Sequence, residues 1–340
     1  MIEPLYKAAD NRYDLGMTYA RSGRSGILLP RISLGFWHNF GEVAPLSRSK
    51  EIIHYAFDHG IVSFDLANNY GPGFGTAEET FGYVFNKSLR PYRDEMFIAS
   101  KAGYNMWEGP YGNWGSRKYL MASLDQSLKR MGLEYVDVFY SHRYDPETPL
   151  EETLQALVDI VRQGKALYAG ISRWPLEAAK FAYDYLRSHD TPCLLYQGRY
   201  NMIDRDVAES GILDATADAG SGFISFSPLA QGILTNRYVN GIPTGSRASN
   251  EQSLKSAQLS DEMIEQIRLL DELAQSRHQT LAEMALAWVL NDKRVTSVIV
   301  GCSSVEQLAD SSKAIENTSF TPEELQKIDA ITSRMQKLMI

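Results

Sequence analysis

Four side chains that could take part in proton transfer lie at or just after the ends of three apolar runs of the sequence. The run FDLANNYG contains Asp65 and, five positions later, Tyr70, whereas IASKAG contains Lys101 and VFYSHR contains His142. An apolar strand seldom carries a buried lysine unless its ammonium is paired, and Asp65 is a carboxylate that could pair with Lys101. Such a pair in a region of low dielectric constant shifts neighbouring pKa values, as catalytic sites require.

The chemistry that fits these four groups is reduction of a carbonyl compound. Hydride addition to a carbonyl produces an alkoxide, which needs a proton as it forms. Tyr70 could donate that proton, and we expect the ammonium of Lys101 to lower the pKa of the phenol. Asp65 would hold Lys101 charged, and His142 would orient the carbonyl oxygen. Taken alone, each residue also has a structural interpretation: Asp65 as a turn cap, Tyr70 as a loop aromatic and His142 as a core histidine.

The elements that must position these residues alternate along the chain. Eight short, nearly continuous apolar runs read as parallel strands buried on both faces. They are Arg31–Trp37, Val62–Ala67, Met96–Ala102, Tyr135–His142, Ala166–Ser172, Cys193–Arg199, Gly222–Pro228 and Val295–Gly301. Amphipathic helices are expected between them, with an N-cap at Ser116 and capping boxes that begin at Thr148, Thr280, Ser304 and Thr321.

Eight strand–helix units in 340 residues predict an α/β fold, a (β/α)₈ TIM barrel. Its active site would lie at the carboxyl ends of the strands. A doubly wound sheet is the alternative, but the nearest dinucleotide-binding pattern, Gly71–Gly75, has Thr76 in place of the third glycine. Residues 17–30 predict an N-terminal β-hairpin turning at Ser22-Gly23, and the long segment 229–279 contains an extra helix near Asp261–Ser276. We expect residues 1–340 to form one barrel domain.

Composition limits the classes of function. The net charge is −8 and no basic tract interrupts the acidic sequence, so we expect neither nucleic-acid binding nor attraction to an anionic membrane. The N-terminal segment is polar, and no run approaches the roughly 20 apolar residues of a membrane span. Cys193 and Cys302 read as buried thiols of a reducing compartment. These features predict a cytoplasmic protein, and the lack of a His, Asp and Glu cluster predicts no metal site.

Several long motifs resemble the aldo-keto reductases, in the branch of potassium-channel β-subunits and their bacterial relatives. These motifs are GFWHNFG (35–41), FDLANNYGPGFGTAEETFG (64–82), SKAGYNMWEGPYG (100–112), SRKYLMASLDQSLKRMGLEYVDVFYSHR (116–143) and LAQGILTNRYVNGIP (229–243). The resemblance implies that Asp65, Tyr70, Lys101 and His142 form the catalytic tetrad. It also implies NADPH as cofactor, a small aldehyde such as L-glyceraldehyde 3-phosphate or methylglyoxal as substrate, and a homo-oligomer, either tetramer or octamer.

The resemblance further assigns the cofactor site residue by residue. Ser172, Arg173 and Gln197 would hold the nicotinamide amide, Phe226 would stack on its ring, and Trp37 and Asp65 would lie beside it. The pyrophosphate would meet Ser227, Pro228, Leu229, Ala230 and Gly232, and basic positions Arg237 and Arg247 would contact cofactor phosphates. Gly301, Ser303 and Gln307 would bind the adenosine 2′-phosphate at a helix start, where free N–H groups favour an anion. Asp310 would accept from the adenine amino group, although Asp310-Ser311 departs from the Glu-Asn common in relatives.

The substrate pocket is expected to include Trp37, Tyr70, Trp107 and His142. Arg143 follows His142 directly, and it could bind a phosphate or carboxylate or form a structural salt bridge. Two other functions stay open from the residues alone. One is a regulatory binding module, like a channel β-subunit, with slow or vestigial turnover. The other is a metal-dependent barrel isomerase or aldolase, in which Lys101 could form a Schiff base, a role that requires a neutral amine.

Overall fold

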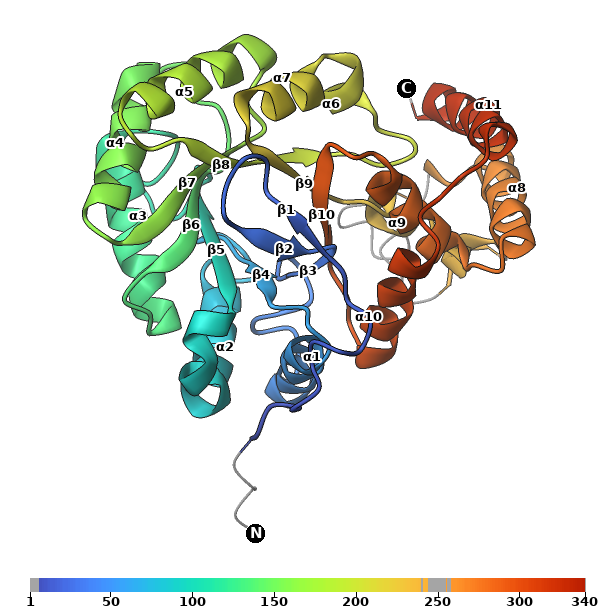
Figure 1. Ribbon diagram of the computed structural model, residues 1–340, viewed down its shortest axis with the longest axis horizontal. Helices are drawn as coiled ribbons and strands as arrows, with labels where there is room; N and C mark the ends of the chain where they lie inside the picture. Colours follow the sequence, from blue (N-terminus) through green and yellow to red (C-terminus); the bar gives the residue numbers. More distant parts are fainter. Residues whose placement is uncertain (1–5, 240, 244–254, 256–257, 340) are drawn as a thin grey trace.

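The computed structural model describes residues 6–239, 241–243, 255 and 258–339. Eight parallel strands close into a barrel in the order β10-β3-β4-β5-β6-β7-β8-β9, and Figure 1 looks onto it with helices around its outside. The strands are β3 (Ile32–Gly35), β4 (Ser63–Asp65), β5 (Phe97–Ala102), β6 (Val136–Ser141), β7 (Ala166–Ser172), β8 (Cys193–Arg199), β9 (Gly222–Phe226) and β10 (Val295–Val300). All eight fall within the predicted runs, and the predicted TIM barrel is confirmed.

The predicted N-terminal hairpin is also present. Strands β1 (Tyr19–Arg21) and β2 (Leu28–Pro30) pair antiparallel, and Figure 1 shows the hairpin in blue lying across the barrel. Leu29 is fully buried in the cluster of apolar side chains inside the barrel. Ser22, at the turn, donates a hydrogen bond from Oγ to the carbonyl oxygen of Leu194 in β8, 3.0 Å away. The hairpin therefore closes the end of the barrel opposite to the carboxyl ends of its strands.

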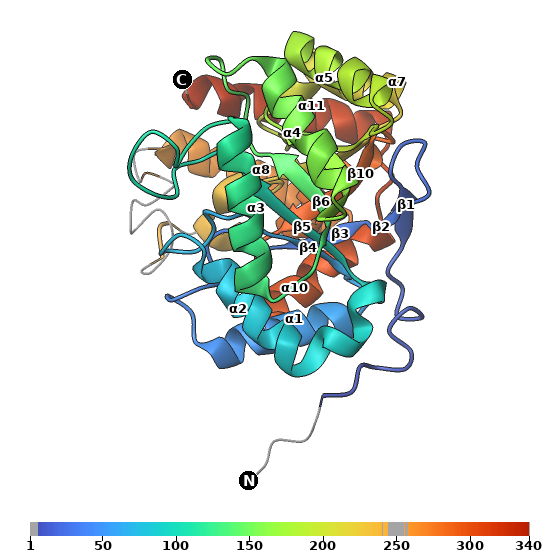
Figure 2. The ribbon, with the colours of Figure 1, turned by 90° about the vertical axis from the view of Figure 1, so that its left-hand side faces the viewer.

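Helices cover the outside of the barrel in the alternating order that the sequence predicts. They are α1 (Leu46–Asp58), α2 (Thr76–Val84), α3 (Arg117–Met131), α4 (Leu150–Arg162), α5 (Leu176–Ser188), α6 (Asp206–Glu209), α7 (Ile212–Ala219), α9 (Leu281–Asn291) and α10 (Val305–Ser312). Shorter turns of other helix types are Phe85–Leu89, Arg90–Glu95, Ala230–Gly232, Asn236–Tyr238 and Lys313–Glu316. The extra helices α8 (Asp261–Ser276) and α11 (Pro322–Leu338) lie side by side at the edge of the barrel (Figures 1 and 2).

The helix starts test the capping predictions individually. Ser116 caps α3 by accepting from the backbone N–H of Tyr119, and full capping boxes open α9 at Thr280 and α11 at Thr321. The prediction at Thr148 is wrong, because Pro149 occupies the N-cap position of α4 and no side chain caps it. Instead, Thr148 donates its hydroxyl to Asp145, so it belongs to a loop network before the helix.

At Ser304 only half of the predicted box forms. The Ser304 hydroxyl accepts from the N–H of Gln307, but the Gln307 side chain accepts from the N–H and hydroxyl of Ser303 instead. Residue 303, one position before the cap, thereby becomes the partner of that side chain.

Both cysteines, Cys193 and Cys302, are buried free thiols, and burial raises the pKa of each to about 12.

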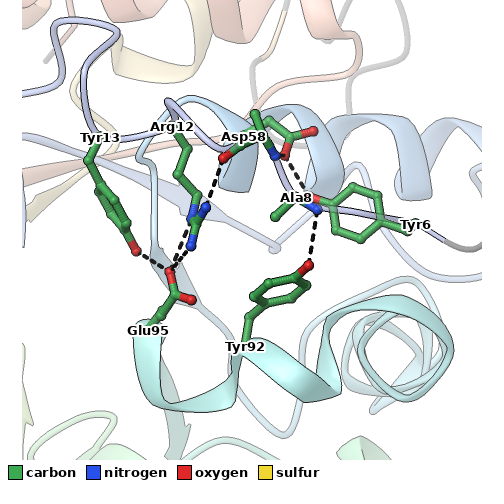
Figure 3. A network of polar contacts seen from close by, with 8 residues as sticks. Tyr6, Ala8, Arg12, Tyr13, Asp58, Tyr92 and Glu95 are labelled. Atoms are coloured by element: carbon green, nitrogen blue, oxygen red, sulfur yellow. Dashed lines mark hydrogen bonds and ion pairs between the residues drawn. The ribbon is translucent and has the colours of Figure 1, made fainter.

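The N-terminal segment is fastened to the barrel by a network of polar contacts (Figure 3). Glu95 accepts hydrogen bonds from Arg12 Nε at 3.0 Å, Arg12 Nη2 at 2.5 Å and the Tyr13 hydroxyl at 2.6 Å. Asp58, at the end of α1, accepts from the Tyr6 hydroxyl and from the N–H of Ala9, each at 2.8 Å. These contacts hold residues 6–14 against α1 and the turn before β5, and thereby fix the chain that leads into the hairpin.

Candidate active site

Three neighbouring strands bring the four predicted catalytic side chains to one end of the barrel. Asp65 ends β4, Lys101 lies near the end of β5, and His142 directly follows β6. The loop after β4 turns back through a hydrogen bond from the N–H of Tyr70 to the carbonyl of Ala67, which places the phenol over the barrel end. The parallel register puts Asp65 opposite Ala99, two residues before Lys101, so the two charged side chains can meet.

Lys101 is fully buried, and its ammonium makes three hydrogen bonds. Its Nζ donates to Asp65 Oδ2 at 2.7 Å, to the carbonyl oxygen of Leu66 at 2.7 Å and to the hydroxyl oxygen of Tyr70 at 3.3 Å. The other carboxylate oxygen of Asp65 accepts from Gln197 Nε2 at 2.8 Å. The predicted ion pair is thus present, and all three donors of a protonated Lys101 have acceptors.

The structure reverses one electrostatic prediction. The pKa of Tyr70 is raised well above its ordinary value, first by burial and then by the negative charge of Asp65, with a smaller lowering from Arg173. We expected the ammonium of Lys101 to lower it, but Asp65 lies against that ammonium and offsets its charge. Burial also lowers the pKa of Lys101, while Asp65 raises it. The phenol therefore stays protonated at neutral pH, which is the form that an acid needs.

His142 is buried beside two phenol rings. Its ring meets Tyr70 edge-on with centroids 5.7 Å apart, and Tyr104 edge-on at 4.7 Å. The pKa of His142 is lowered well below its ordinary value, first by burial and then by the charges of Lys101, Arg173 and Arg143. A neutral imidazole can donate one N–H, and Nδ1 has no hydrogen-bond partner among the described residues. The group is therefore suited to hydrogen-bond a neutral carbonyl.

The opposite side of the barrel mouth has features that fit a nicotinamide cofactor. Ser172 and Gln197 are buried at the ends of β7 and β8, and the Ser172 hydroxyl has no partner among the described residues. Phe226 ends β9 with a half-exposed ring. After it, Ser227, Ala230, Gln231 and Gly232 have positive φ angles, so this short loop is folded tightly over the mouth. A buried unpaired hydroxyl indicates a missing polar partner, as a carboxamide would supply.

The rim that follows β10 offers an anion site. Gly301 and Gln307 are exposed and Ser303 is partly exposed at the start of α10, where the helix dipole favours a negative charge. The N–H groups of Ser303 and Gln307 already donate to Gln307 Oε1 and Ser304 Oγ, so an anion would have to displace these local contacts or approach the side chains. Asp310 is partly exposed on the same helix and accepts from Lys313 at 3.2 Å. Arg237 is exposed after β9. The predicted contact Arg247 lies outside the described residues.

The predicted pocket aromatics differ in their surroundings. Trp37 is 45% exposed and lies against the ring of His38, with centroids 3.7 Å apart. Trp107 is half-buried and packs against Tyr119 of α3, at 5.1 Å between centroids. Sequence reasoning missed Tyr104, which borders His142 and accepts a hydrogen bond from Arg173 at 3.0 Å. Its only signal was its place three residues after Lys101, on a strand end already assigned to the site.

The described residues include neither a cluster suited to a metal ion nor a helix suited to a membrane span. No group of three or more His, Cys, Asp or Glu side chains there is arranged to hold a metal ion. None of the helices in the same residues combines the length and hydrophobicity needed to cross a membrane. A groove of about 790 Å³ is lined mainly by polar side chains that include Arg277, Glu283 and Asp310, the residue predicted to contact the adenine.

Comparison with known proteins agrees with this geometry. A model of the aldo/keto reductase family matches residues 31–333. The chain is 52% identical over 317 residues to L-glyceraldehyde 3-phosphate reductases from Escherichia coli O157:H7 and Escherichia coli strain K12, covering 92% of each chain. It is 35% identical to a putative voltage-gated potassium channel subunit beta from Schizosaccharomyces pombe, over 91% of each chain. The resemblance stated from the sequence motifs, to this family and to both groups of relatives, is confirmed.

Proposed function

The chain belongs to the aldo/keto reductase family, and we propose that it is an NADPH-dependent reductase of small aldehydes in which Tyr70 protonates the carbonyl oxygen. One observation carries this proposal: a fully buried ammonium, Lys101, joins the Asp65 carboxylate to the hydroxyl oxygen of Tyr70. Because the phenol oxygen accepts from Lys101, its own hydrogen is free to point at a substrate.

In this mechanism the protein manages the proton and orients the carbonyl. When bound, the reduced nicotinamide supplies a hydride to the carbonyl carbon. Tyr70 gives its proton to the oxygen as negative charge develops there. The ammonium of Lys101 then stabilises the tyrosinate, and Asp65 keeps that ammonium charged and in position. The neutral His142 donates a hydrogen bond that orients the carbonyl oxygen.

The same geometry disfavours a Schiff base on Lys101. A Schiff-base lysine attacks a carbonyl with the lone pair of a neutral amine. Here Nζ lies 2.7 Å from a carboxylate oxygen and donates to three acceptors, which leaves no lone pair in the protonated form. The presence of all four tetrad residues likewise favours a working reductase over a purely regulatory module.

For the cofactor we propose NADPH, bound across the mouth from β7 to α10. Ser172, Arg173 and Gln197 would hold the carboxamide, and Phe226 would stack on the ring, with Trp37 and Asp65 beside it. The tight loop Ser227–Gly232 would hold the pyrophosphate, Arg237 and Arg247 would contact phosphates, and Asp310 would accept from the adenine. Gly301, Ser303 and Gln307 would bind the 2′-phosphate that distinguishes NADPH from NADH. The unpaired Ser172 hydroxyl, together with the position of these three residues at the start of α10, where the helix dipole favours an anion, supports this assignment.

For the substrate we propose L-glyceraldehyde 3-phosphate, with methylglyoxal as a second candidate. The 52% identity to L-glyceraldehyde 3-phosphate reductases supports the first. Trp37, Tyr70, Trp107 and His142 would form the pocket. We also propose that residues 1–340 form a single domain, that it works in the cytoplasm, and that it assembles as a homo-oligomer of four or eight copies.

The proposal is tested by following NADPH oxidation with L-glyceraldehyde 3-phosphate, methylglyoxal and other small aldehydes. We expect saturable turnover with at least one of them, and a lower kcat/KM when NADH replaces NADPH. If the protein binds NADPH but oxidises it with none of these aldehydes, the regulatory module is the better description.

A further inference from the structure

Arg143, the residue after His142, is held between two aromatic rings beside the tetrad. The centre of its guanidinium lies 4.4 Å from the ring centroid of Tyr104 and 3.6 Å from that of Trp114. Its Nε donates to the carbonyl of Gly103 and its Nη2 to Asn113 Oδ1, both at 2.8 Å. The guanidinium is therefore fixed in orientation, while Nη1 has no partner among the described residues.

The loop that carries Asn113 and Trp114 is strained in a way that serves this arrangement. Trp114 has a φ of 70°, a conformation that a bulky side chain rarely adopts. Asn113 Oδ1 accepts both from the N–H of Trp114, at 2.9 Å, and from Arg143. Gly115 is tied to Asp145, which accepts from its N–H at 2.9 Å. Backbone strain of this kind persists where surrounding contacts enforce it, and it concentrates at ligand sites.

The positive charge of Arg143 has no carboxylate ion partner among the described residues. Asp145 lies nearby, but it accepts hydrogen bonds from Gly115, Glu147 and Thr148, which fix it as part of the loop. A second cation, Arg173, has no ion partner in this part of the chain either, and it donates to the Tyr104 hydroxyl at 3.0 Å. Two guanidinium groups without an ion pair therefore gather around Tyr104, Arg143 over its ring and Arg173 at its hydroxyl, and they create a local positive potential that an anion would relieve.

We propose that Arg143, clamped between Tyr104 and Trp114 next to His142, binds the phosphate of a phosphorylated aldehyde substrate and so sets the preference of the enzyme. Arg173 adds positive potential at the hydroxyl of Tyr104. The proposal rests on the proposed function, because His142 and Tyr70 must hold the carbonyl for the phosphate to reach Arg143. A phosphate monoester suits a planar guanidinium with a fixed orientation, since its oxygens can accept two parallel N–H groups.

The experiment compares glyceraldehyde 3-phosphate with unphosphorylated glyceraldehyde in wild-type protein and in Arg143→Gln. The measured quantity is the ratio of kcat/KM for the two substrates, so that a general loss of activity cancels. We expect the ratio to fall by about 30- to 100-fold, as for loss of a charged hydrogen-bond pair. Arg143→Lys keeps the positive charge but loses the paired N–H groups of the guanidinium and its stacking on the aromatic rings. We expect this variant to recover part of the ratio.

A matched control is Arg93→Gln at the other end of the barrel. Arg93 also stacks on an aromatic ring, that of Tyr135 at 4.2 Å, and donates to backbone carbonyls. It pairs with Asp137, so its loss destabilises the protein, but we expect the substrate ratio to stay at the wild-type value. A fall of the same size in this control would show that the ratio reports stability, and would overturn the proposal.

The outcomes separate this inference from the proposed function. If wild-type protein reduces both aldehydes but Arg143→Gln leaves the ratio unchanged, or weakens NADPH binding by the same factor, the phosphate site is wrong and the reductase assignment stands. If wild-type protein reduces neither aldehyde, the proposed function fails. In that case, binding of glycerol 3-phosphate decides the site: loss of binding in Arg143→Gln supports it, and equal affinity in the two proteins overturns it.

Discussion

Replacing Tyr70 by phenylalanine removes the proposed acid and little else. The lost contact is one hydrogen bond, from Lys101 Nζ to the phenol oxygen at 3.3 Å, while the bonds to Asp65 and to Leu66 remain. An unmade hydrogen bond to a charged group costs about 1–3 kcal/mol. Because folded proteins have roughly 5–15 kcal/mol of stability, we expect Tyr70→Phe to stay folded.

The effect on turnover should be much larger. A positioned acid contributes a factor of about 100 to 10,000, or roughly 2.7–5.4 kcal/mol of barrier. The pKa of Tyr70 is raised by burial, and the acid form exists below the pKa. In wild-type protein kcat should therefore stay level through neutral pH and fall only above about pH 10, the ordinary value for a phenol. Had Lys101 lowered that pKa toward neutrality, kcat would already fall between about pH 7 and 9.

The assay measures kcat from NADPH oxidation across pH, and the dissociation constant of NADPH from quenching of protein fluorescence. We expect Tyr70→Phe to keep the NADPH affinity of wild-type protein. Tyr183→Phe is the control, because it removes another hydrogen-bonded hydroxyl, 2.8 Å from that of Thr216 and outside the mouth. A Tyr70→Phe variant with kcat within about fivefold of wild type would refute the reasoning, since it falls below the range for an acid.

Three further predictions concern separate features. Lys101→Met leaves the Asp65 carboxylate buried without its cation, so the free energy of unfolding in denaturant titration should fall by about 3–5 kcal/mol. Adding Asp65→Asn to this variant should recover part of the lost stability. Equal stability of wild type and the single variant would contradict the pairing. Ser303→Asp places a negative charge at the start of α10, where it would repel the 2′-phosphate. Fluorescence titration should then show an affinity for NADPH at least tenfold weaker and an affinity for NADH little changed. An equal loss of affinity for both cofactors would argue against a 2′-phosphate site. Glu95→Ala removes the acceptor of three hydrogen bonds that hold the N-terminal segment, so unfolding should cost about 1–3 kcal/mol less, with faster proteolysis before residue 17; unchanged proteolysis would show that the segment is held elsewhere.

Most of the barrel could be predicted because its signals are local. Each strand is a short apolar run, and side-chain caps such as Thr280 and Thr321 lie within four residues of their partners. The error at Thr148 arose from a longer-range competitor. Asp145 accepts from Thr148 and also from Gly115, thirty residues away, and this network takes the hydroxyl from the helix start. A capping pattern alone does not reveal such a competitor.

In the site, too, the sequence predicts which residues pair, but it does not predict the effect of their surroundings. That Lys101 needs a carboxylate follows from its apolar strand, and Asp65 is the partner in the structure. The sign of the Tyr70 shift does not follow, because it depends on the relative size of burial, the Asp65 charge and the neutralised ammonium. Tyr104 and Trp114 were missed for a related reason: their roles come from ring positions around Arg143, which no spacing in the sequence encodes.

The acidity of the chain and its proposed anionic ligands are compatible for a physical reason. A net charge of −8 would repel NADPH and a phosphorylated aldehyde at long range. At physiological ionic strength that repulsion is screened beyond about 8 Å, whereas charges within a partly buried site are screened much less. A bound anion is therefore attracted mainly by Arg143, Arg173 and the start of α10, and the net charge of the chain matters little to it.

The backbone strain is concentrated at the same end of the barrel. Among the described residues, five of the seven non-glycine positions with positive φ lie in loops at the carboxyl ends of strands, including Trp114, Arg173 and Ser227. The strained loops thus lie at the end of the barrel where cations and N–H groups must converge on the proposed ligands, and the hairpin closes the opposite end.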